Sequence, residues 1–186
     1  MANYTTMDTV KITEKEAASR QLDAAIQLLF AGGDIVAVHT LAGAGSKMAS
    51  DLIQLEQPDE PWDLSTQEIS YPIQKSYFEL MIATQDISKR ANVDPDSTHE
   101  FAISDTLALL ASAVFDLAKL AGELTTPQAV YQIWYAACNF DALDPSFEHY
   151  AVVKKVMGDQ SKRTISYQLA VGRRELREAM QDTRVA

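Results

Sequence analysis

The sequence is poor in the residues that fix small proteins covalently or through metal ions. Its 186 residues include one cysteine, Cys138, which excludes a disulfide within the chain. The three histidines never pair at the two spacings, His-x-x-His and His-x3-His, that place two ligands on one helix face. We therefore predict no metal site and no cofactor.

Long apolar segments are also missing. No apolar run approaches the roughly 20 residues of a membrane span. The first residues lack the basic and apolar regions of a signal peptide. A chain with a 47% apolar fraction can bury a core, so we expect a globular protein of the cytoplasm with no membrane partner.

Positive charge is scarce and unevenly placed. Against 16 Lys+Arg stand 26 Asp+Glu, a net charge of -10, so we expect no nonspecific binding to nucleic acid. Residues 151–186 hold 8 basic and 4 acidic residues, whereas residues 1–150 hold 8 and 22. This basic end either packs on the acidic body or reaches an acidic surface on a second subunit, which would make a homodimer. A basic strip that contacts RNA is a weaker third alternative.

The first part of the chain predicts two helices joined by a tight turn. Thr13 and Glu16 have the spacing of a capping box, and Gly32-Gly33 breaks the apolar pattern that follows. Asp34 is placed to cap a second helix that runs to about Gln54. So short a break favours an antiparallel hairpin.

Further helix starts and stops divide the rest of the chain. They fall near Tyr71-Pro72, at Ser104 or Asp105 with a stop at Gly122, at Thr126-Pro127, at Asp144-Pro145 with an end at Met157, and from about Ser161 to Gln181. The fold class is therefore all-α, an antiparallel helical bundle of about six to seven helices. We expect a flexible N-terminus over residues 1–12, the bundle over 13–158, and a basic C-terminal helix over 159–186.

Few residues suggest chemistry. His39 lies on a largely apolar helix, where a structural hydrogen bond competes with a ligand-contacting role. Gly43 to Lys47 lacks the spacing of a phosphate-binding loop, so the small residues at 42–46 more simply let another helix approach. Cys138 is expected to be a buried, inert thiol.

Two segments carry a resemblance. Residues 17–30 and 33–44, with His39-Thr40-Leu41-Ala42 in the second, resemble a family of uncharacterised bacterial all-helical proteins. Asp94-Pro95-Asp96 and Trp134 extend the likeness, which covers roughly residues 13–140. The resemblance implies an all-helical fold and carries over no activity.

A more distant similarity is to HEPN-type ribonucleases. Relatives have an Asn-aromatic-aromatic-Lys-His-Ala-Asp stretch, which corresponds here to residues 86–92 with Arg90 in place of histidine. The ribonucleases use an Arg-x4-6-His pair, whereas Arg90 and His99 are separated by eight residues. This departure argues against activity.

We therefore predict a non-catalytic helical module, homodimeric, that acts through a protein or small-ligand interface. The alternative is a divergent HEPN-type ribonuclease. A pocket between helices lined by Trp134, Tyr77 and His39 would serve either function. The candidate functional residues are His39, Lys89, Arg90, Asp94 and Trp134.

Overall fold

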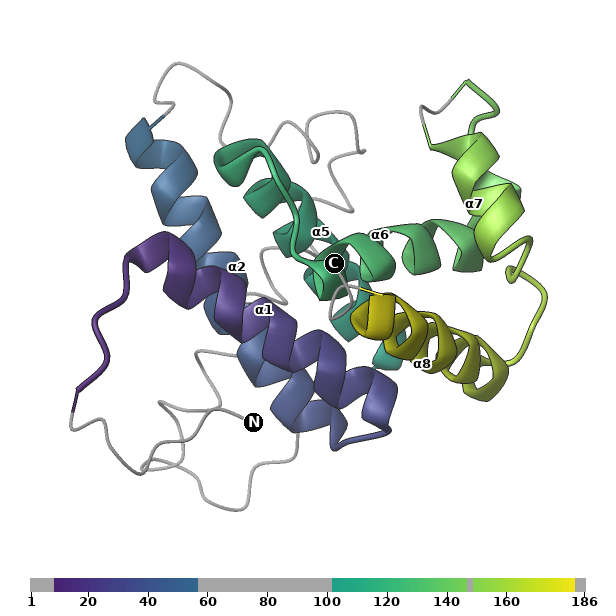
Figure 1. Ribbon diagram of the computed structural model, residues 1–186, viewed down its shortest axis with the longest axis horizontal. Helices are drawn as coiled ribbons and strands as arrows, with labels where there is room; N and C mark the ends of the chain where they lie inside the picture. Colours follow the sequence, from purple (N-terminus) through teal and green to yellow (C-terminus); the bar gives the residue numbers. More distant parts are fainter. Residues whose placement is uncertain (1–8, 57–101, 147–148, 183–186) are drawn as a thin grey trace.

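The computed structural model describes residues 9–56, 102–146 and 149–182 (Figure 1). These residues form α-helices and one short 3-10 turn, with no strand among them, so the all-α prediction is confirmed. None of the helices in these three ranges is long and apolar enough to span a bilayer.

The predicted first hairpin is confirmed. Helix α1 (Glu14–Ala31) starts on the capping box, in which the Thr13 hydroxyl accepts from the Glu16 amide at 3.2 Å and the Glu16 carboxylate accepts from the Thr13 amide at 2.8 Å. It ends at Gly32, whose φ of 77° is the left-handed conformation that favours glycine. Helix α2 (Ile35–Glu56) then returns antiparallel beside α1 (Figure 1). Its first amides, of Val36 and Ala37, donate to the Asp34 carboxylate as predicted.

The small residues of α2 allow the close approach that the sequence predicts. A Cβ atom on Gly45 would lie 2.6 Å from Leu22 Cδ2 of α1, so a larger residue would push the two helices apart.

The predicted cap of the fourth helix, Ser104 or Asp105, is wrong. Helix α5 (Ile103–Ala121) follows Ala102, which has no side chain to cap it, while Ser104 and Asp105 already lie in the first turn. There the Ser104 hydroxyl donates to the Asp105 carboxylate at 3.3 Å rather than capping a backbone amide. The predicted stop at Gly122 is confirmed by its φ of 72°.

The N-cap of helix α6 (Thr126–Cys138) lies one residue before the predicted one. Thr125, not Thr126, is the N-cap, and its hydroxyl accepts from the Gln128 amide at 3.4 Å. The Gln128 side chain accepts from the Thr125 amide in return, which completes a capping box.

The last two segments are shorter than predicted because aspartates close turns. The Asp144 carboxylate accepts from the Ser146 amide at 2.7 Å, so no helix starts there. A 3-10 turn, η2 (Phe140–Ala142), precedes it and α7 (Tyr150–Val156) follows. Asp159 holds Ser161 in the same way, and α8 (Ile165–Asp182) starts only after that turn. The predicted helix near Tyr71-Pro72 lies outside the described residues.

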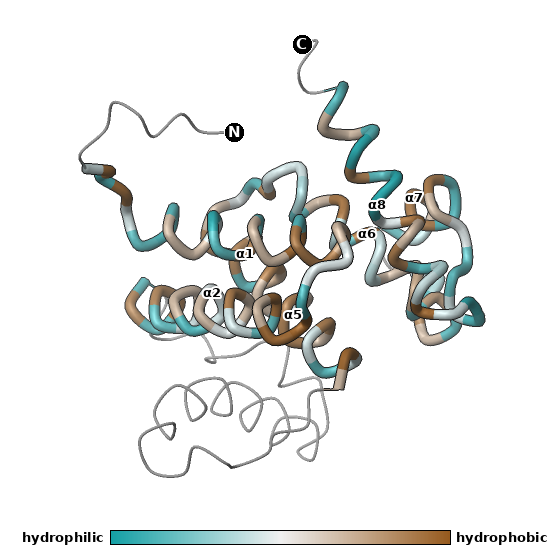
Figure 2. The backbone as a smooth tube through the Cα atoms, turned by 90° about the horizontal axis from the view of Figure 1, so that it is seen from below, coloured by the Kyte–Doolittle hydropathy of each residue, from teal (hydrophilic) through white to brown (hydrophobic). Residues whose placement is uncertain are grey.

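The core is built where α1, α2 and α5 meet and where α6 covers them. Helix α5 is mostly apolar along its length, whereas α8 alternates between apolar and polar residues (Figure 2). The largest fully buried side chains are Trp134, Tyr131, Phe30, Leu22, Ile26, Leu109 and Leu110. Burying one such side chain stabilises the fold by about 1.5–3 kcal/mol.

Helix α8 packs on α6 and on the end of α1 through a point of close contact (Figure 1). A Cβ atom on Gly172 would lie 2.3 Å from Cε1 of Phe30, so the phenyl edge of Phe30 rests directly on the α8 backbone. Arg173 Nε also donates to the Phe30 carbonyl at the end of α1. A cation there complements the negative end of the helix dipole, and α1 has no basic residue of its own in its last turn.

Replacing Gly172 by alanine tests this contact. Helix propensity alone would favour alanine by about 1 kcal/mol. Because Phe30 is 1% exposed and its ring packs against Tyr131 and Trp134, we expect G172A to lower the free energy of unfolding instead, by about 1–3 kcal/mol. The double variant with Phe30→Leu should lose less than the sum of the two single variants in chemical denaturation. Additive losses would contradict the contact.

Candidate functional site

A cavity of about 300 Å³ opens between the start of α5, the end of α6 and the start of α8. We call it the α5/α6/α8 pocket. Its lining is mostly apolar or aromatic, with a few polar side chains: Ile103, Ser104, Leu107, Tyr135, Cys138, Asn139, Ile165 and Gln168. This combination is typical of small-molecule sites, in which a few polar groups orient a mainly apolar ligand.

Gln168 is the most firmly held polar residue of the pocket. Its side-chain nitrogen Nε2 donates to the carbonyl of Gln160 at 2.8 Å, and its own backbone carbonyl accepts from the Trp134 indole at 2.6 Å. The backbone N–H of Gln160 donates to the backbone carbonyl of Ala137 at 3.0 Å. These bonds fix the start of α8 against α6 and leave Gln168 only 9% exposed.

The hydrogen bond to Gln160 also determines which way the Gln168 amide faces. A backbone carbonyl only accepts, so the nitrogen of the amide must face Gln160 and the oxygen must face away. No described residue donates to this oxygen. The pocket therefore contains an acceptor to which a ligand or water can donate.

Two other pocket residues remain uncharged at neutral pH. Burial raises the pKa of the Cys138 thiol to about 12. Burial also raises the pKa of the Tyr135 phenol, and the neighbouring Cys138 adds to this effect. The thiol and the phenol therefore stay protonated, and Tyr135 offers a hydroxyl donor.

The structure places two of the five candidate residues, and neither lines the pocket. His39 is 2% exposed between α2 and α5, where its Nδ1 lies 3.0 Å from Thr106 Oγ1. Trp134 is fully buried and packs edge-on against Phe30, with ring centroids 5.1 Å apart. Trp134 is linked to the pocket through its bond to the Gln168 carbonyl. Lys89, Arg90 and Asp94 lie outside the described residues, as does Tyr77.

A signal for Gln168 was nevertheless present in the sequence. The apolar face of the last helix runs through Ile165, Leu169 and Gly172, and Gln168 falls on the same face. A polar residue on a buried stripe needs a hydrogen-bond partner, so it marks a place to look for one.

A second polar cluster joins α1 to α6. The Asp23 carboxylate accepts from the Thr125 hydroxyl at 2.5 Å and from Gln128 Nε2 at 2.9 Å. Gln128 Nε2 also donates to the Ser19 hydroxyl at 3.0 Å. Burial raises the pKa of Asp23, and the bonds from Thr125 and Gln128 oppose that rise. Because every partner belongs to a helix cap or a helix face, we interpret this cluster as structural.

Within the described ranges, no three histidine, cysteine or acidic side chains lie close enough together to hold a metal ion. Comparison with models of protein families, with curated proteins and with solved structures finds no match to this chain.

The raised pKa of Cys138 predicts that its thiol reacts slowly with disulfides. At pH 8 the folded protein should react with a soluble aromatic disulfide far more slowly than the chain unfolded in guanidinium chloride, because the thiolate is the reactive form. Absorbance of the released thiolate measures both rates. Equal rates would show that the pocket does not suppress ionisation of Cys138.

The raised pKa of Asp23 predicts a pH dependence of stability. The folded state binds this proton more tightly than the unfolded chain does. Protonated Asp23 therefore favours folding below its ordinary value of 3.8, and this contribution is lost as the pH rises through the higher folded value. Asp23→Asn keeps an oxygen acceptor and cannot titrate.

We therefore expect Asp23→Asn to gain stability relative to the native protein as the pH rises from about 3.8 through the higher pKa of Asp23 in the folded state. Urea denaturation at several pH values measures the difference. Asp141→Asn, at an exposed position outside the cluster, is the matched control. A difference that shrinks with rising pH would contradict the assignment.

Proposed function

We propose that this protein is a non-catalytic helical module that binds a small molecule in the α5/α6/α8 pocket. The observation that carries the proposal is Gln168, a pocket residue whose side-chain nitrogen is bound to Gln160 and whose side-chain oxygen accepts from no described residue. The bonds to Gln160 and Trp134 hold this residue in place. A ligand that donates to the oxygen therefore meets an acceptor that is already oriented.

The ionisation of the lining groups favours binding over turnover. A general base or a nucleophile must be available in its reactive form near neutral pH. Among the described lining residues, the thiol of Cys138 and the phenol of Tyr135 are the ionisable groups, and burial keeps both protonated. These groups support recognition of a ligand and offer it no activated attack.

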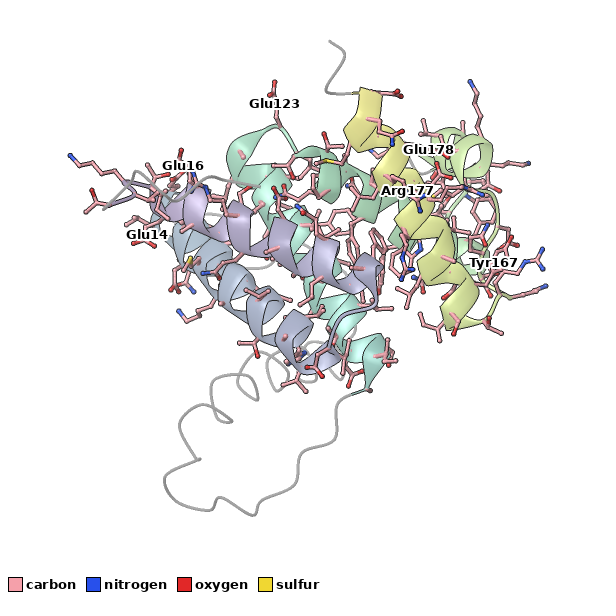
Figure 3. All side chains as sticks on the ribbon, turned by 60° about the horizontal axis from the view of Figure 1, so that its bottom comes forward. Glu14, Glu16, Glu123, Tyr167, Arg177 and Glu178 are labelled. Carbon is pink, nitrogen blue, oxygen red and sulfur yellow. The ribbon has the colours of Figure 1, made fainter. Side chains whose placement is uncertain are left out.

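The basic end supports the proposal of a homodimer. Lys154, Lys155, Lys162 and Arg163 are exposed, and none of them forms a salt bridge with the described acidic residues. Helix α8 instead meets the body through Phe30 and through the Arg173 bond to its carbonyl. In Figure 3, Tyr167 and Arg177 of α8 lie at the opposite end of the molecule from Glu14 and Glu16 of α1. Arg163 lies over the Tyr167 ring, and Lys162 and Arg163 help to lower the pKa of Asp159. Lys154 and Lys155 are therefore the cations that would meet an acidic surface on a second copy.

The ribonuclease alternative depends on residues 86–99, which lie outside the described part of the chain. It remains an expectation from the resemblance alone.

Native mass spectrometry of protein purified from the organism that encodes it tests the proposal. We expect chains that carry one defined small-molecule mass, and a subunit number of two. Ser104→Phe places a ring at the exposed edge of the pocket and should remove the added mass. Ala129→Phe adds the same ring at an exposed position of α6 away from the lining, and should keep it.

The two parts of the result are independent. An added mass that survives in S104F, or chains without any added mass, would overturn the pocket as the functional site. A monomer would overturn the homodimer and leave the pocket proposal unaffected.

A further inference from the structure

Resting on the proposed function, we infer that the α5/α6/α8 pocket selects an uncharged, mainly apolar small molecule that carries a hydroxyl group. Three properties of the pocket lead to this ligand class: its volume, the absence of charge from its described lining, and the hydrogen-bonding groups that it offers.

The volume limits the ligand to one or two rings. An apolar cavity of about 150 Å³ in a protein interior holds one benzene molecule. The pocket has about 300 Å³, roughly twice that volume, and it lies at the lower end of the range for ligand sites. Nucleotides and peptides are larger than this volume and would extend out of its opening.

The lining selects against charge. Its described residues include no lysine, arginine, histidine, aspartate or glutamate. A carboxylate or an ammonium group in this pocket would lose water and gain no opposite charge, which costs more than the loss of a neutral polar group. The bonded Ser104 hydroxyl and the Asn139 amide at the exposed edge do not replace a counter-ion.

The hydrogen-bonding groups favour a hydroxyl. Gln168 presents an oxygen that accepts, and Tyr135 presents a phenol that donates. A ligand hydroxyl is both donor and acceptor, so it can bond to either residue. A hydrocarbon would displace water from these groups without replacing its hydrogen bonds, which lowers affinity.

Four probes of similar size separate the effect of the hydroxyl group from the effect of charge: phenol, toluene, benzoate and benzylamine at pH 7. Binding is measured by titration of each probe into the isotope-labelled full chain, followed by amide chemical shifts in two-dimensional NMR. We expect phenol to shift amides around Tyr135 and Gln168 and to bind about tenfold more tightly than toluene. Benzoate and benzylamine should bind at least about tenfold more weakly than phenol.

Substitution of the donor provides the control for position. Tyr135→Phe removes the hydroxyl and keeps the ring. The affinity for phenol should therefore fall to within about threefold of the affinity for toluene, and the affinity for toluene should not change. Tyr167→Phe, on an exposed ring of α8 outside the lining, is the matched variant and should leave both affinities unchanged.

Each other outcome overturns a defined part of the argument. If benzoate or benzylamine binds in the pocket as tightly as phenol, the ligand class is wrong and the pocket remains a binding site. If phenol and toluene bind equally, the hydroxyl requirement is wrong. If none of the four shifts the pocket amides at millimolar concentration, the proposed function itself fails, and this inference with it.

Discussion

The position of α8 depends on the contact between the Phe30 ring and the backbone at Gly172. Glycine at this one position lets α8 approach the end of α1 closely enough for Arg173 to reach the Phe30 carbonyl. The same approach brings Gln168 under the Trp134 indole, and the resulting bond fixes the start of α8 against α6. The third wall of the pocket is therefore set by a packing constraint one turn further along α8. A side chain at position 172 would move that wall before it affected any residue of the lining.

Local chemistry explains which helix ends were predictable. The cap at Thr13 and the glycine stops at Gly32 and Gly122 act through backbone geometry within a few residues, so the sequence carries the whole signal. The starts at Asp144 and Ser161 were wrong because an aspartate that caps a helix and one that closes a turn accept from the same nearby amides, as Asp144 and Asp159 do here. Which of the two forms depends on whether the following residues have a surface to pack on, and that surface comes from other helices.

In the candidate site, too, features that depend on nearby residues were predictable and features that depend on other helices were not. His39 and Trp134 stand out in the sequence because they are rare residue types on apolar helices, yet the structure uses both as hydrogen-bonded parts of the core. The pocket instead draws on ordinary residues from three helices, and residues of different helices, such as Leu107 and Tyr135, are far apart in the chain. Only Gln168 left a local sign, as a polar residue on an otherwise apolar face.

The charge of the whole chain and the charge of the pocket follow different rules. A net charge of -10 acts over the surface, where salt screens it and where it influences which macromolecules approach. In the proposed site a ligand responds mainly to the few groups that it touches, and none of the described lining groups is charged. The protonated phenol of Tyr135 and the bound amide of Gln168 would then add selectivity by hydrogen bonding to the selection by volume and by the lack of charge. For this reason an acidic protein can prefer a neutral ligand, and the salt dependence of binding to the proposed site should be small.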